Sequence, residues 1–155
     1  RIAIQSDLLG GWALDIKNIL CIYGDQVSSG DQPEAKEVRD LDSIGVIKTA
    51  HQFKTQNTLP SGREILSSPE YFIGAADSPF EIDKDFDCKN LLNKINSGTN
   101  FFQTQFAFDY KVLANYMKRL NDFKTCNLVE KLEIPVNEHN KNVYFFYWCE
   151  SFKGL

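Results

Sequence analysis

The sequence predicts an α/β fold built on parallel strands. Three short apolar runs, at 19–23, 71–76 and 101–106, have the length and composition of buried strands. Segments with helical periodicity lie between them, and strands that alternate with helices favour a parallel sheet with right-handed crossovers. Polar residues follow each run, and in such folds ligands bind at the carboxyl ends of the strands.

The first elements follow from periodicity and its interruptions. Apolar residues recur at helical spacing from Ile4 to Ile16, which predicts a helix, and Asn18 ends that pattern. Ile19–Tyr23 is the first predicted strand, and it stops at Gly24-Asp25. Proline suits the first position of a helix, so Pro33-Glu-Ala35 predicts that another helix begins after the polar loop.

The later elements repeat this alternation. Asp42-Ser43 offers an N-cap for an amphipathic helix, and a long polar loop over 55–70 leads to the second strand. Asp87 offers a cap for a helix that ends at Ser97-Gly98, before the third strand. A clean apolar stripe from Val112 to Leu120 predicts the last helix.

The number of strands limits the architecture. A complete (β/α)8 TIM barrel takes about 250 residues, so we expect residues 1–122 to form the central portion of such a barrel, which is incomplete. Residues 123–155 have weak periodicity until the aromatic run 143–149, which has strong β propensity. We interpret them as a tail of uncertain structure that is either divergent or read from a shifted frame.

Composition excludes several classes of function. The net charge is −4 and no basic stripe is present, so a nucleic-acid partner is not expected. No apolar run approaches the roughly 20 residues that cross a bilayer. The cysteines form no C-x-x-C pair and no metal-ligand spacing with His51 or His139, so we expect no metal site and a reducing, cytoplasmic location. Cys21, inside the first strand, is expected to be a buried free thiol.

Asp25 and Gln105 are the strongest candidates for a site. Asp25 follows Gly24 at a strand end, where an aspartate is about as often a turn residue as a carboxylate aimed into a cleft. Gln105 is polar within an apolar strand and needs a partner. Its amide either makes a hydrogen bond in the core or reads the edge of a heterocycle.

Three further polar residues share one helix face. Asp87, Asn90 and Lys94 lie at i, i+3 and i+7. The ordinary interpretation is a solvated face, and the functional one is a polar clamp on ribose and phosphate groups. Ser28-Ser-Gly30 lacks the spacing of a phosphate-binding loop.

Three stretches of the chain, in order, resemble methylenetetrahydrofolate reductase. They are Ile-Leu-Cys-Ile-Tyr-Gly-Asp25, Phe-Ile-Gly-Ala-Ala-Asp-Ser-Pro79 and the run from Ile95 through Thr-Gln105 to Asp109. The loop Gly30–Lys36 with Asp40–Ser43 is similar to a bacterial branch of that family, and the resemblance covers roughly 2–122. It implies a (β/α)8 barrel with FAD that reduces 5,10-methylenetetrahydrofolate to 5-methyltetrahydrofolate, with NADH or NADPH as the electron donor.

The resemblance also implies roles for the candidate residues. Asp25 would lie by the flavin and the folate, as the catalytic carboxylate, a flavin contact and a substrate contact. Tyr23 and Gly24 would touch the flavin, and Gln105 would contact the pterin and the nicotinamide. The flavin-binding helix of the family carries Asp, Asn and Lys at the spacing of the set Asp87, Asn90 and Lys94.

The chain also departs from the family pattern. Asn93 stands where an arginine is expected, and Asp77-Ser-Pro-Phe80 replaces the usual Tyr and His. The family's general-acid glutamate maps upstream of Arg1, so we expect little activity from this chain alone. The alternative is a non-catalytic, folate-binding partial barrel that a partner completes, because open sheet edges invite association, including with a second copy. A folate-handling barrel without flavin is a third option.

Overall fold

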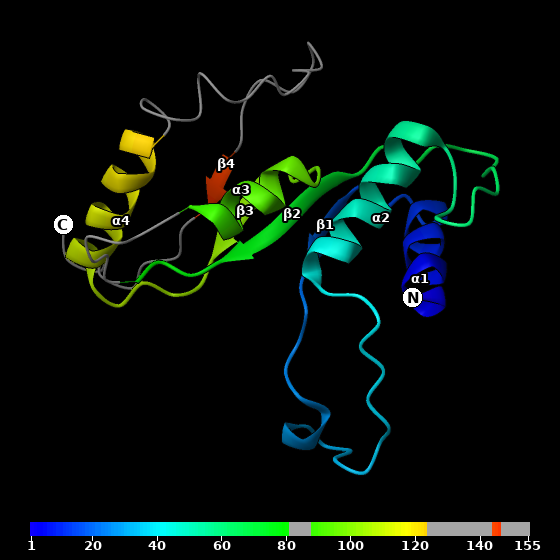
Figure 1. Cartoon of the computed structure of the whole chain (residues 1–155), viewed down its shortest axis with the longest axis horizontal. Helices are drawn as coiled ribbons and strands as arrows, with labels where there is room; N and C mark the ends of the chain where they lie inside the picture. The colour runs from blue at the N-terminus through cyan, green and yellow to red at the C-terminus, as the bar shows by residue number, and fades with distance from the viewer. Residues whose placement is uncertain (81–87, 124–143, 147–155) are drawn as a thin grey trace. The chain divides into compact units, whose positions relative to one another are not determined.

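The computed structural model describes residues 1–80, 88–123 and 144–146 (Figure 1). The chain divides into two compact units, Arg1–Ala75 and Ala76–Leu155. Helices and strands alternate along it in the order α1 (Ile2–Ala13), β1 (Asn18–Cys21), the 3-10 helix η1 (Val27–Ser29), α2 (Ser43–Gln56), β2 (Phe72–Asp77), α3 (Lys89–Asn96), β3 (Phe101–Thr104), α4 (Tyr110–Phe123) and β4 (Tyr144–Phe146).

In the first unit the two strands are parallel. β1 pairs with β2 in a register that runs from Asn18 opposite Phe72 to Cys21 opposite Ala75. Parallel neighbours need a long crossover connection, and the crossover here contains η1 and α2. This arrangement confirms the predicted α/β class with parallel strands.

The core of the first unit lies between α2 and the strands. Ile47, Ala50 and Phe53, which form the apolar stripe of α2, are fully buried, as is Ile73 of β2. The side chain of Tyr71 is also buried, and its hydroxyl donates a hydrogen bond to the carbonyl of Leu8 in α1. A buried hydroxyl must find such a partner, so this bond anchors α1 to the start of β2.

Capping explains where two of the helices begin and end. The carboxylate of Asp42 accepts a hydrogen bond from the amide of Gly45 at 2.7 Å, which confirms the predicted N-cap of α2. α1 ends at Ala13, earlier than the predicted Ile16, because Asp15 adopts the left-handed conformation with φ 62°. The amide of Ile16 then donates to the carbonyl of Gly11, so Ile16 packs back on the helix although it lies outside it.

The helix predicted to begin at Pro33 is absent. The residues from Ile22 to Asp42 form a loop, in which η1 is the only helical segment and Ala35 closes a turn on Gln32. A short helix is stable only when packing buries an apolar face. Only two large apolar residues follow Pro33 in this loop. Val38 is exposed, and Leu41 lies directly before the N-cap of α2, so no such face exists after Pro33.

In the second unit, β3 pairs in parallel with β4, from Phe101 opposite Tyr144 to Gln103 opposite Phe146. The aromatic run of the tail, which has strong β propensity, forms a strand over 144–146, and residues 124–143 and 147–155 lie outside the described residues. β3 ends at Thr104, before the predicted end at Phe106. The apolar stripe predicted for α4 is confirmed, because Tyr116 and Leu120 are buried against Cys88.

Candidate functional site

The first candidate lies at the corner that follows β1. Gly24 has a positive φ of 77°, which glycine adopts without strain, and no atom lies within 4 Å of the position that a Cβ would take. Asp25 is exposed. Among the described residues, none bonds to its carboxylate. The corner thus leaves space beside Gly24 and an Asp25 carboxylate that no described residue binds.

An arginine on the far side of the loop holds this corner. The guanidinium of Arg39 lies over the ring of Tyr23, with its central carbon 4.4 Å from the ring centroid. It donates hydrogen bonds to the main-chain carbonyl of Asp25 and to the carboxylate of Glu37. Its interactions with Tyr23, and then with Glu37, raise the pKa of Arg39 above its usual value, so its positive charge is permanent.

Sequence reasoning missed Arg39. Its contact with Asp25 spans 14 residues of a loop that contains no periodic pattern. The one local signal is the alternation Glu37-Val-Arg39, which in an extended chain places both charged side chains on the same side. That pattern gives no partner, so the contact itself was not predictable.

The second group of candidates lies in the second unit, at the carboxyl ends of β2 and β3. The main-chain amide of Gln105 donates to the main-chain carbonyl of Asp77 at 2.8 Å, which joins the two strand ends. The ammonium group of Lys94, in α3, donates to the carbonyl of Ala76 at 2.7 Å. Tyr116 of α4 donates to the carboxylate of Asp77 at 2.8 Å. Residues from three elements therefore meet at one strand end.

The side chains of the predicted residues differ in exposure. Gln105 lies just past β3 and is exposed, so its amide is not buried in the core. Asn90 is exposed and Lys94 is half-buried on α3. Asp87 lies outside the described residues. The structure brings Lys94 and the Gln105 main chain to neighbouring carbonyls, Ala76 and Asp77, whereas Tyr23, Gly24 and Asp25 belong to the first unit.

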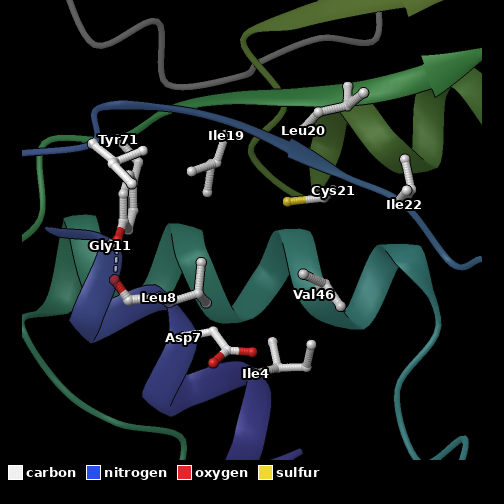
Figure 2. A pocket seen from close by; sticks show the side chains of 11 residues that line it. Ile4, Asp7, Leu8, Gly11, Ile19, Leu20, Cys21, Ile22, Val46 and Tyr71 are labelled. Atoms are coloured by element: carbon white, nitrogen blue, oxygen red, sulfur yellow. Dashed lines mark hydrogen bonds between the residues drawn. The ribbon is translucent and has the colours of Figure 1, made fainter. Parts of the chain in front are cut away.

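A separate apolar pocket of about 380 Å³ lies between α1, β1 and α2 (Figure 2). Figure 2 shows Ile19 and Cys21 pointing from β1 toward the helices, whereas Leu20 and Ile22 point the other way. Burial raises the pKa of the Cys21 thiol to about 11, so it stays protonated and unreactive at neutral pH. The pocket therefore offers mainly hydrophobic contact, and Asp7 is the one charged residue in its lining.

Two site types are missing from the part of the chain that the structure describes. No cluster of three or more His, Cys, Asp or Glu side chains is placed to hold a metal ion there. Within the same residues, no helix has the length and apolarity needed to cross a membrane.

The sequence was compared with known protein families and with curated proteins. A family model described as methylenetetrahydrofolate reductase matches residues 1–149 of the 155-residue chain. A search of the curated proteins returned no significant match. The match to the family model extends over both units of the structure.

Proposed function

Because this chain belongs to the methylenetetrahydrofolate reductase family, we propose that it acts in the FAD-mediated reduction of 5,10-methylenetetrahydrofolate to 5-methyltetrahydrofolate. Membership of the family supports an oxidoreductase that acts on a folate substrate. The structural observation that carries the proposal is the exposed carboxylate of Asp25, in the loop that follows the carboxyl end of the parallel strand β1. That is the position at which parallel α/β folds hold their catalytic groups.

Asp25 would supply negative charge to the reaction. Hydride transfer to the methylene carbon passes through a cationic iminium form of the folate, and a fixed carboxylate stabilises such a cation. The main chain at Asp25 is tied down by Arg39. Because the main chain that carries the carboxylate is held in place, little free energy is spent on its reorganisation when the cation forms. This arrangement supports a catalytic role for Asp25.

The residues present fit a flavin. The space around Gly24 is open, which allows a flat ring to approach the main chain, and Tyr23 would contribute its backbone. In the second unit, Asn90 and Lys94 present an amide and an ammonium group that suit the ribose and phosphate groups of FAD. When bound, FAD would carry hydride from a reduced nicotinamide, NADH or NADPH, to the folate.

Gln105 would recognise a heterocycle. A side-chain amide carries both donors and an acceptor, which matches the alternating edge of a pterin or of the nicotinamide carboxamide. Its exposed position after β3 supports this role. Its backbone bond to Asp77 fixes where the side chain starts.

The wider setting follows from the family. We propose that residues 1–122 form the central portion of a (β/α)8 barrel, that 123–155 form a tail whose residues 144–146 pair with β3, and that the protein works in the cytoplasm. Asp87, which precedes α3 in the chain, would act with Asn90 and Lys94 in flavin binding.

The test begins with flavin binding by the full chain. We expect the purified protein to be yellow or to become so with added FAD, and NADH or NADPH should bleach the bound flavin under anaerobic conditions. A protein that stays colourless and gives no binding isotherm with FAD would overturn the proposal. Binding of folate without flavin would favour the flavin-free alternative.

Two pairs of variants test the assigned residues. Asp25→Asn should slow folate reduction by about a hundredfold or more, as loss of a transition-state contact does, whereas Asp31→Asn on the same exposed loop should not.

Lys94→Met should weaken FAD binding about tenfold, and Lys118→Met, exposed on α4, is its control. Equal effects within a pair would contradict the assigned role.

A further inference from the structure

We propose that Arg39 is a positioning residue, which fixes the main chain at the Asp25 corner and leaves the Asp25 carboxylate free for a ligand. The inference rests on the function proposed above for Asp25. It is carried by three contacts of one guanidinium group, to Tyr23, Asp25 and Glu37, all within the first unit.

The first argument is the shape of the contact. The guanidinium stacks over the Tyr23 ring while it donates to the carbonyl of Asp25, so it holds the corner on both sides of Gly24. A planar guanidinium can lie flat on a ring and donate hydrogen bonds in its own plane, whereas a lysine ammonium has no flat face to stack. Only about a quarter of the Arg39 side chain is exposed, at 23%, so the group is ordered by packing as well as by charge.

The second argument is that the pairing of β1 with β2 ends before this corner. Its last pair is Cys21 with Ala75, and the corner contains Gly24, whose residue type has more conformational freedom than any other. Glu37 adds a second tie, because the carboxylate oxygen that accepts from Arg39 also accepts from the amide of Val27 at 3.4 Å. Side chains of residues 37 and 39 therefore replace the missing strand hydrogen bonds.

The third argument is which oxygen Arg39 takes. An arginine beside a carboxylate commonly forms a bidentate ion pair that neutralises it. Here the guanidinium bonds to the backbone carbonyl of Asp25 and to the carboxylate of Glu37 instead. The corner is thereby fixed while the Asp25 carboxylate keeps its capacity to bind a cationic or hydrogen-bonding ligand.

Limited proteolysis of the full chain measures the hold on the corner. Chymotrypsin cleaves after aromatic residues in chain segments that can open, and cleavage after Tyr23 should follow the population of the open corner. Arg39→Ala should raise the rate about three- to tenfold, as expected for loss of one hydrogen bond of typical net strength at an exposed site. Arg39→Lys should restore little protection, and added guanidinium ion at millimolar concentration should restore part of it.

The control is Arg63→Ala, which removes the same charge from an exposed loop of the same unit. It should leave cleavage after Tyr23 unchanged. An Arg39→Ala chain that is cleaved no faster than the wild type, with the same circular dichroism, would overturn the proposal.

A double-mutant cycle tests the link to Asp25. The affinity of the flavin-loaded chain for 5-methyltetrahydrofolate is measured for wild type, Arg39→Ala, Asp25→Asn and the double variant. If Arg39 acts through Asp25, its substitution weakens binding in the wild type but adds little once Asp25 is neutral. A loss of equal size in both backgrounds would contradict the positioning role.

The two experiments separate two failures. A chain that binds neither FAD nor the folate overturns the proposed function, and the proteolysis comparison alone then decides whether Arg39 holds the corner. A chain that binds both ligands, with Arg39→Ala indistinguishable from wild type in the two assays, overturns the role of Arg39 and leaves the proposed function intact.

Discussion

Burial sets the chemistry of Cys21. Its thiol is free, lies within β1 and is only 4% exposed, as the sequence predicts. Loss of water around the thiolate raises the pKa of this thiol from its ordinary value of 9.0 to about 11. The thiolate is the reactive form, so the residue belongs to the packing of the first unit and has no place in the proposed chemistry.

The raised pKa predicts how stability depends on pH. The unfolded chain loses the Cys21 proton near pH 9 and the folded chain near pH 11. The contribution of Cys21 to the free energy of unfolding is therefore complete below pH 9 and declines as the pH rises through this window. Urea denaturation at a series of pH values should show this decline, and Cys21→Ala should reduce it. An identical pH dependence in both chains would contradict the assignment.

Arg39 stabilises a loop through contacts between residues that are far apart in the sequence. It belongs to no helix or strand, yet it joins Tyr23 and Asp25 on one side of the loop to Glu37 on the other. The geometry at Asp25 therefore depends on a contact that no local pattern encodes. A conservative change to lysine removes the planar group and is not neutral here.

At the scale of the element, α2 is specified by its own sequence. Asp42 caps its first turn, Ile47, Ala50 and Phe53 bury one face, and Asn57 ends it in the left-handed conformation with φ 54°. Each of these signals can be read from the residues alone. They agree with one another, which is why the predicted helix is confirmed.

Removing the cap tests this account. Asp42→Ala leaves the amide of Gly45 without its 2.7 Å partner, and loss of such a cap costs about 1 kcal/mol of stability. Urea denaturation should show a lower midpoint with an unchanged slope. Asp31→Ala, on an exposed part of the preceding loop, is the matched control. A cap that contributes nothing would leave the two variants equally stable.

The same scale shows why other predictions failed. Proline at a first helical position is a local preference, and the loop after Pro33 has no buried face to make a helix of it. The strand ends, by contrast, lie close to where the apolar runs stop, because buried strands need apolar residues. Strands β1, β2 and β3 end at Cys21, Asp77 and Thr104. The polar residues after those ends were therefore found, whereas the bonds from Lys94 to Ala76 and from Tyr116 to Asp77 depend on tertiary packing.

At the scale of the whole molecule, family membership joins the two units in one proposed function. The family model spans 1–149, and each unit supplies a different kind of group. The first contributes the carboxylate of Asp25, whose main chain Arg39 holds, and the second contributes the ammonium group of Lys94 and the exposed side chain of Gln105.

Linkage between FAD binding and folding tests this at the level of the chain. A ligand that binds only the folded state stabilises it by mass action, so FAD at about 100 times its Kd should raise the free energy of unfolding by about 2.7 kcal/mol. Thermal denaturation with increasing FAD should show a midpoint that rises with concentration. Lys94→Met should need about ten times more FAD for the same rise, and Lys118→Met should behave as wild type. A midpoint that does not depend on FAD would show that the folded chain does not bind it, and would remove the cofactor from the proposal.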